Sequence, residues 1–471
     1  MIRYHARWVL PITGPPIEHG TVGVEDGRIV HIGVRHPEPV RSAQGELREG
    51  KSPGRAERDV DLGDMILMPG LVNAHTHLEL TAMRGFLENL DFRRWILRLT
   101  SAKRSVMTPE MLLDSARAGV EEGIAAGITT YADTCDSGAA MDAMLEYGVR
   151  GIMYQEVFGP DPAQCADSLA GLTAKLGPLR RRASTLVRVG ISPHAPYTVS
   201  DDLFRATTRL AIAEGLPMAI HIAESDLEWS LVVEGRGSFA EGLRGRGIKV
   251  DPRAPTPIRL LDSLGALAAR PLLIHCVRVD AADLEIIAQA KSAVAHCPIS
   301  NAKLGHGIAP LLEILAAGID VGLGSDSVAS NNRMDLLDEA RAALLFQRAR
   351  AATHEALGAA DVLELATLGG ACAMGLAGEI GSLEVGKAAD LAAFAVGPMG
   401  PTFDPVAAAV FALSGARARF VAVAGKPLLV DGLLTAPSAG LHGRVQTTAD
   451  ALSSWLDAGG EMQPPPPAGV R

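Results

Sequence analysis

Two histidines separated by one residue give the strongest chemical signal in the sequence. His75 and His77 stand directly after the apolar run Ile66-Leu67-Met68 and the pair Pro69-Gly70. In a strand, side chains two residues apart point to the same face, so both imidazoles aim the same way. Two imidazoles on one face can ligate one metal ion. Alone, the pair fits two solvent-exposed histidines better, so the metal interpretation depends on the other strand ends.

Four further polar residues stand at or just after the ends of later apolar runs. His221 can supply a third nitrogen, and Glu224, three residues on, would lie within reach of a metal-bound water. His275 closes a third run, where a core histidine is an equally good interpretation. Asp326 ends a fourth run, where a carboxylate is costly unless it is paired, caps a helix or binds metal. Helix-start roles compete for Glu224 and Asp326 when each is taken alone.

The remaining strand ends carry weaker candidates. His194, between Pro193 and Pro196, is either a substrate contact or a loop residue. His296 is either core packing or a weak site candidate. No lysine ends the strand before His194, so the sequence supplies ligands for one metal ion and lacks a bridging carboxylated lysine for a second.

The elements that must position these residues alternate between strand and helix. Thr108-Pro109 predicts a helix start, and glycines such as Gly127 and Gly215 predict helix ends. Eight strands alternating with helices predict an α/β fold, a (β/α)8 TIM-type barrel, whose active site lies at the C-terminal strand ends. A doubly wound open sheet is the alternative. The predicted strands are Ile66–His77, Ile128–Thr134, Arg150–Phe158, Val187–His194, Pro217–Glu224, Pro271–Val277, Ser292–Pro298 and Asp320–Asp326.

Both ends of the chain have a different sequence pattern, one that predicts short strands and tight turns. Asp26-Gly27 between alternating runs predicts a hairpin, and residues 41–58 predict an exposed loop. We expect the two ends to pair into one composite β-sandwich. The predicted domains are 1–66 with 376–445 for the β-sandwich, 67–375 for the barrel, and 446–471 for a C-terminal tail that is disordered at its end.

Composition excludes several classes of protein. The 471 residues are 48% hydrophobic, which excludes global disorder, and the net charge of −10 with 4% aromatic residues argues against nucleic-acid binding. No apolar run approaches the length of about 18 residues that a membrane helix needs. Five scattered cysteines and the absence of a signal-peptide pattern predict a cytoplasmic protein.

The sequence resembles the amidohydrolase superfamily over nearly its whole length. It is most similar to the branch of S-adenosylhomocysteine, methylthioadenosine and guanine deaminases and triazine chlorohydrolases. The residues that carry this resemblance are 69–77, His221–Ser225, His275-Cys276, His296–Asn301, Leu304–Pro310, Gly324–Ser327 with Ser330-Asn331, and Leu383–Leu391.

This resemblance implies one zinc ion, or iron as Fe2+, held by His75, His77, His221 and Asp326. It also implies Glu224 as proton shuttle, His275 as hydrogen-bonding partner of water or substrate, and His194 as substrate contact. A bound metal can lower the pKa of water from 15.7 to about 7. The expected reaction is hydrolytic deamination: attack at the ring carbon that bears the amino group, with Glu224 protonating the ring nitrogen and then the departing amine.

The substrate is expected to be a small molecule, an aminated purine or nucleoside-like ring. Glu79 and Trp95 give a pattern similar to aminodeoxyfutalosine deaminases, so Glu79 would bind a ribose or an amine and Trp95 would stack on a base. A helix-start acid and core packing are the respective alternatives. Arg84 either meets a substrate carboxylate or forms a surface salt bridge.

Two other functions remain open at this point. One is a hydrolase that uses the same site on an s-triazine or cyclic amide, and the other is an inactive barrel acting as a binding protein. The presence of all four ligands and Glu224 speaks against an inactive barrel. By resemblance, we also expect a homo-oligomer, a dimer or larger.

Overall fold

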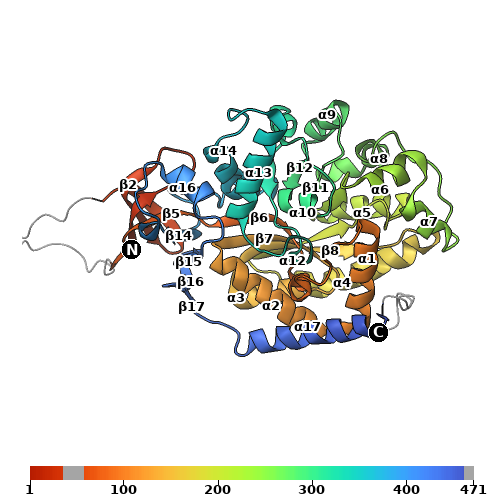
Figure 1. The fold of residues 1–471 in the computed structure, drawn as a ribbon, viewed down its shortest axis with the longest axis horizontal. Helices are drawn as coiled ribbons and strands as arrows, with labels where there is room; N and C mark the ends of the chain where they lie inside the picture. Colours follow the sequence, from red (N-terminus) through yellow and green to blue (C-terminus); the bar gives the residue numbers. More distant parts are fainter. Residues whose placement is uncertain (36–57, 461–471) are drawn as a thin grey trace, which may run out of the picture.

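The computed structural model describes residues 1–35 and 58–460. One part of the molecule is a mixed β-sheet built from both ends of the chain, and the other alternates parallel strands with helices (Figure 1). The predicted loop at 41–58 lies outside the described residues except for Arg58, and so does the end of the predicted tail, from residue 461 on.

The parallel strands form two four-stranded sheets, ordered β6-β7-β8-β9 and β10-β11-β12-β13. Helices connect consecutive strands, as parallel pairing requires. The strands are β6 (Leu71–Thr76), β7 (Ile128–Cys135), β8 (Arg150–Val157), β9 (Val187–Pro193), β10 (Ala219–Ile222), β11 (Leu272–His275), β12 (Ala293–His296) and β13 (Val321–Leu323). The main helices between or after them are α1 (Phe92–Val106), α2 (Pro109–Ala125), α3 (Ala139–Tyr147), α4 (Cys165–Arg182), α5 (Asp201–Glu214), α6 (Asp226–Trp229), α7 (Ser238–Arg244), α8 (Pro257–Ser263), α9 (Ala281–Ala290), α10 (Pro298–Lys303), α11 (Leu311–Ala316), α12 (Val328–Asn331) and α13 (Leu336–Ala351).

The first predicted strand is in fact two strands in different sheets. Its first half is β5 (Met65–Pro69), which pairs with strands of the mixed sheet, and its second half is β6. The break falls at Gly70, where a Cβ atom would overlap the side chain of Thr129. A single apolar run therefore crosses from one part of the molecule to the other. Six of the other seven predicted segments contain one whole parallel strand, and β7 runs one residue beyond its predicted segment, to Cys135.

The two parallel sheets share one apolar core. The cluster contains residues from six of the eight strands: Val72, Ala132, Ile152, Ala219, Ile274 and Ala295. Isolated parallel bridges also join the sheets at both edges, Thr76 to Asp326 and Ile191 to Met218. The outer faces of the strands pack against the helices in a separate, larger core.

The mixed sheet has nine strands and curves strongly. Its order is β17-β16-β15-β14-β5-β1-β2-β3, with β4 paired to β1. Tyr4 on β1 and Phe420 on β15 have ring centroids 4.9 Å apart, although their strands are three places apart, which is about 14 Å in a flat sheet. The sheet therefore wraps around its own core. Its strands are β1 (Ile2–Val9), β2 (Ile17–Glu25), β3 (Arg28–Val34), β4 (Arg58–Asp61), β5, β14 (Leu391–Ala395), β15 (Phe420–Val423), β16 (Lys426–Val430) and β17 (Leu433–Leu434).

Local signals read from the sequence are confirmed at several places. Asp26 and Gly27 both have positive φ, 48° and 79°, in the turn that joins β2 to β3. Thr108 caps α2 through its side chain, and Gly215 ends α5 with φ 61°.

Near its end the chain forms α17 (Leu441–Asp457), which packs along α2, where Arg444 pairs with Asp114 (Figure 1). Residues 446–457 of the predicted tail thus belong to this helix. Within residues 1–35 and 58–460, no helix has the length and apolar character needed to cross a membrane.

Candidate active site

Three imidazoles and one carboxylate, far apart in sequence, meet at the C-terminal ends of the parallel strands. His75 lies on β6, His77 directly after it, His221 on β10, and Asp326 three residues after β13. The Nε2 atoms of His75 and His77 lie 3.3 and 3.7 Å from Oδ1 of Asp326. The His221 ring centroid is 4.8 Å from that of His75 and 5.4 Å from that of His77. The structure thus brings all four predicted ligands together.

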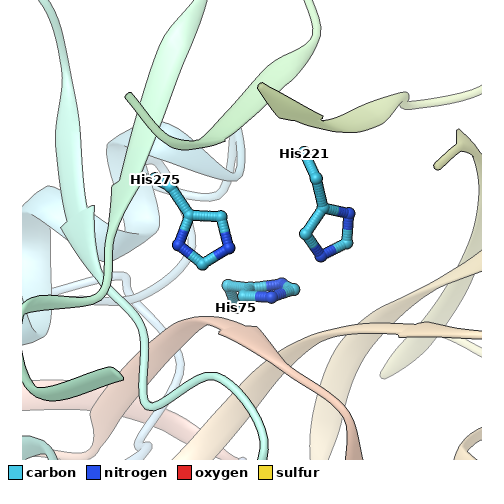
Figure 2. A group of neighbouring side chains, drawn as sticks. All are labelled: His75, His221 and His275. Atoms are coloured by element: carbon cyan, nitrogen blue, oxygen red, sulfur yellow. The ribbon is translucent and has the colours of Figure 1, made fainter. Parts of the chain in front are cut away.

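His275 joins the same group from β11. His75, His221 and His275 each offer a nitrogen within 4.8 Å of the others, and their rings converge from separate strands (Figure 2). A second group with the same spacing is His75, His77 and Asp326. His75 is common to both and lies at the centre of the arrangement.

The chemistry of these donors fits a divalent metal ion. Burial, followed by the proximity of the His75 ring, lowers the pKa of His77 to about 3, and burial also lowers the pKa of His75 and places that of His221 well below its usual value. The imidazoles are therefore neutral, the form that ligates metal. Nε2 of His75 and Nδ1 of His221 are buried without a hydrogen-bond partner. A hydrogen bond from Nδ1 of His77 to the carbonyl oxygen of Thr134, at 2.8 Å, orients the His77 ring.

Asp326 is held as an anion. Burial alone would raise the pKa of its carboxyl group, but the nearby His75 ring outweighs burial and holds this pKa well below its ordinary value. Its other oxygen, Oδ2, accepts hydrogen bonds from Ser300 Oγ at 2.6 Å and Ser330 Oγ at 3.0 Å. The cap of α12 is Ser327, whose side chain accepts from the backbone of Ala329. The helix-cap interpretation of Asp326 is therefore wrong.

Glu224 faces the same space from the end of β10. Its Oε1 lies 3.5 Å from Nε2 of His275 and 3.4 Å from Nε2 of His306. Burial opposes ionisation, but the nearby rings of His275 and His306 keep the pKa of Glu224 below its ordinary value. The adjacent α6 is capped by Ser225, so Glu224 is free of a capping role. A buried carboxyl group beside two imidazoles can give and accept protons.

The backbone adopts a left-handed conformation at three of these strand ends. Ala223, His275 and Asp326 have φ values of 53°, 78° and 53°. Such conformations cost non-glycine residues on the order of 1–3 kcal/mol each and concentrate at active sites. They turn the chain sharply where each strand ends, which aims Glu224, His275 and Asp326 toward the common centre.

Two other histidines, His194 and His296, were weaker candidates for the site. The His194 ring lies 4.6 Å from that of His221, and its Nδ1 is 2.8 Å from Thr198 Oγ1. His194 therefore borders the group of ligands. His296 is buried with both ring nitrogens unpartnered, and burial lowers its pKa to about 3.

The three other predicted substrate contacts have partners within the chain. Glu79 is buried, and its two oxygens contact Lys103 and Ser137. Arg84 contacts Glu122 on α2 and the backbone oxygen of Asn332. Trp95 is half-buried on α1 against Phe92, with ring centroids 6.3 Å apart.

Several residues of the site were missed by reasoning from strand ends. His306 lies in a loop after α10, and Asn301 accepts from Nδ1 of His275 at 3.0 Å from within α10. Ser300 and Ser330, which support Asp326, lie on short helices. Their segments are part of the resemblance to the amidohydrolases, and that was the available signal for them.

Comparison with known proteins agrees with this geometry. The chain is 32% identical over 430 residues to a 5-methylthioadenosine/S-adenosylhomocysteine deaminase of Moorella thermoacetica, covering 90% of this chain and 93% of the relative. It is 31% identical over 441 residues to a 5'-deoxyadenosine deaminase of Methanothermobacter thermautotrophicus, covering 90% and 93%. A zinc-bound adenosine deaminase structure from Xanthomonas campestris superposes with a TM-score of 0.83 at 28% identity, covering 96% and 98%. The model of the amidohydrolase family matches residues 66–428, and the chain belongs to this family.

Proposed function

We propose that this protein is a metal-dependent hydrolase that releases ammonia from an aminated purine or nucleoside-like substrate. The observation that carries the proposal is Glu224, whose carboxyl group stands between His275 and His306 beside the four predicted ligands. The names of the relatives, which are deaminases of adenosine-type nucleosides, support the same reaction. A buried acid at this position is what protonation of a ring nitrogen requires.

The metal in this proposal is one Zn2+ ion, with Fe2+ as the alternative. His75, His77, His221 and Asp326 would hold it, since neutral imidazole nitrogens and carboxylate oxygens are donors that Zn2+ accepts. When bound, such an ion lowers the pKa of water toward about 7. The bound zinc of the Xanthomonas campestris adenosine deaminase supports this choice.

The protein's own groups would then move the protons. Asn301 Oδ1 accepts from Nδ1 of His275, so in the neutral ring Nε2 is the acceptor that faces Glu224. Asp326, fixed by two serine hydroxyls, takes a proton from the attacking water. Glu224 takes the other proton of that water and gives it to the ring nitrogen next to the reacting carbon. The proton held by Asp326 then passes by way of Glu224 to the departing amine, so that both carboxylates end deprotonated. His194, at the border of the site, contacts the substrate.

We also propose that the two parallel sheets close into one (β/α)8 barrel. The shared inner core and the bridges Thr76–Asp326 and Ile191–Met218 at the two edges support closure. A cytoplasmic location fits the five cysteines, all of which are free.

Ammonia release by the purified, metal-loaded protein tests the proposed reaction. The panel contains adenosine, methylthioadenosine, S-adenosylhomocysteine, guanine and aminodeoxyfutalosine. Glu224→Gln should retain the metal but lower kcat by about 10²–10⁴-fold, the usual range for a proton-transfer group. Glu214→Gln, at an exposed glutamate paired with Arg180, is the matched control and should leave kcat unchanged. A near-normal rate in Glu224→Gln, or no ammonia from any compound, would contradict the proposal.

A further inference from the structure

Glu156 is a buried carboxyl group at the site for which the proposed reaction gives no role. It lies near the C-terminal end of β8, two residues after Tyr154 and four after Ile152, both of which belong to the inner core. Because side chains alternate along a strand, Glu156 faces inward too. Its side chain is only 6% exposed, and Oε1 is buried without a hydrogen-bond partner. Such a group lowers stability unless something pairs with it.

A ring nitrogen of His194 faces this oxygen. Nε2 of His194 lies 4.0 Å from Oε1 of Glu156, too far for a direct hydrogen bond. The other nitrogen, Nδ1, is 2.8 Å from Thr198 Oγ1, and that hydroxyl in turn donates to the carbonyl oxygen of Ala195 at 3.1 Å. A hydroxyl has only one proton, so both bonds form when His194 donates from Nδ1. In the neutral ring, Nε2 is then an acceptor that faces Glu156.

Aromatic rings lie on both sides of His194. Phe158, two residues after Glu156, keeps 38% of its surface exposed, and its ring centroid is 5.2 Å from that of His194. The His221 ring lies on the other side of His194 at 4.6 Å. The Glu156–His194 pair therefore lies between the predicted metal ligands and an exposed aromatic surface.

We propose that Glu156 and His194 together bind a hydroxyl group of the substrate, namely a sugar hydroxyl of the nucleoside. A hydroxyl can donate one hydrogen bond and accept another, so it suits this pair whichever protonation state Glu156 has. This inference rests on the proposed function and adds to it a residue that selects nucleosides over free bases. It also explains why an unpartnered carboxyl group is retained in the inner core.

A second cation is the competing occupant of the same gap. Glu156, His194 and His221 offer ligand atoms within 4.8 Å of one another. However, His221 is also one of the predicted ligands of the first metal, so a second ion here would have to share its ring. We therefore favour the hydroxyl, and the metal content of the protein separates the two occupants.

The test compares wild-type holoenzyme with Glu156→Leu and Glu156→Gln. Ammonia release is measured with adenosine, with its 2'-, 3'- and 5'-deoxy forms, and with 9-methyladenine, which lacks the sugar. For Glu156→Leu we expect KM to rise about 10- to 100-fold for adenosine, the effect of one lost hydrogen bond. We expect no change of KM for 9-methyladenine or for the deoxy form that lacks the recognised hydroxyl. The value of kcat should stay within about twofold, and Glu156→Gln should show a smaller rise because it keeps one acceptor.

Two further measurements separate binding from a structural role. Replacement of an unpartnered buried carboxyl group by leucine should leave the thermal unfolding midpoint equal or higher. Metal content should be one equivalent in all three proteins. The inference is overturned by an equal loss with 9-methyladenine, by an unchanged KM for adenosine, by a clearly lower unfolding midpoint, or by two metal equivalents that fall to one in Glu156→Leu. Failure of the proposed function looks different, because then the wild-type protein itself releases no ammonia.

Discussion

Glu228 holds the backbone of Glu224 in place. Its Oε2 accepts a hydrogen bond from the amide of Glu224 at 2.9 Å, and its Oε1 accepts one from the amide of Ala223 at the same distance. Glu228 is fully buried, and Ala223 has the left-handed φ of 53°. The proton-transfer group proposed for this enzyme is thus positioned by a second glutamate one helical turn away.

Substitution of Glu228 should therefore impair turnover without removing the metal. In Glu228→Gln one acceptor oxygen becomes an amide donor that faces a backbone N–H, which costs about 1–3 kcal/mol for the unsatisfied groups. We expect a lower unfolding midpoint and a fall in kcat of roughly 10- to 100-fold, with metal content unchanged. The rate of ammonia release and the metal content of the purified variant check this prediction. Unchanged kcat would show that Glu228 does not position Glu224.

Loss of a serine hydroxyl that donates a hydrogen bond to Asp326 should weaken metal binding. Ser300 Oγ lies 2.6 Å from Oδ2 of Asp326 and Ser330 Oγ lies 3.0 Å from it. Supporting groups of this kind typically contribute 10- to 100-fold in metal affinity. Zinc affinity, measured by competition with a chelator, should fall by about that factor in Ser300→Ala. Ser327→Ala, which removes only the cap of α12, is the control and should change affinity less. An equal effect of the two substitutions would assign the loss to the helix.

Stability at mildly acidic pH should depend on His296. Its pKa is lowered by burial from 6.5 to about 3, whereas the unfolded chain binds a proton below pH 6.5. Its contribution to stability is therefore present above pH 6.5 and is lost as pH falls toward 3. At pH 5 the loss is about 2 kcal/mol. Since neither ring nitrogen has a hydrogen-bond partner, His296→Leu should remove this dependence.

Thermal unfolding of wild type and His296→Leu between pH 7.5 and pH 4.5 gives the comparison. The difference in stability between the two proteins should move in favour of the variant as pH falls. Parallel curves over this range would show that His296 does not set the acid sensitivity.

The contact between the parallel-strand part and the mixed sheet should be stabilised by a buried ion pair. Arg150, at the start of β8, bonds Asp390 through Nε at 2.8 Å and through Nη2 at 3.3 Å, and both side chains are at most 6% exposed. Removal of one partner leaves a buried charge and costs about 3–5 kcal/mol. Arg150→Met should therefore lower the unfolding midpoint strongly.

The matched control for Arg150→Met is Arg180→Met. Arg180 pairs with Glu214, and both side chains are nearly half exposed. Exposed pairs contribute about 0–1 kcal/mol. Calorimetry should give a large shift for the first variant and a small one for the second. Shifts of similar size would show that the Arg150 pair does not stabilise the contact between the two parts.

The sequence alone predicted the strand segments and the four residues that come together as candidate ligands. His75 and His77 could be assigned to one face because a strand repeats every two residues, and the helix start at Thr108 follows from local hydrogen bonding. These features depend only on near neighbours in the chain. The division of one apolar run into β5 and β6 was not predicted, because it depends on contact between Gly70 and the distant Thr129.

The tertiary structure decided which side chains contact the residues of the candidate site. Ser300 reaches Asp326, His306 reaches Glu224, and Glu156 faces His194 across 4.0 Å. The residues in each of these contacts are not separated by a regular spacing in the sequence, so no sequence pattern predicts them. Each arises because parallel strands end at the same edge and because left-handed turns at His275 and Asp326 redirect the backbone there. Local sequence therefore fixes where a strand ends, whereas only packing fixes what its last side chain meets.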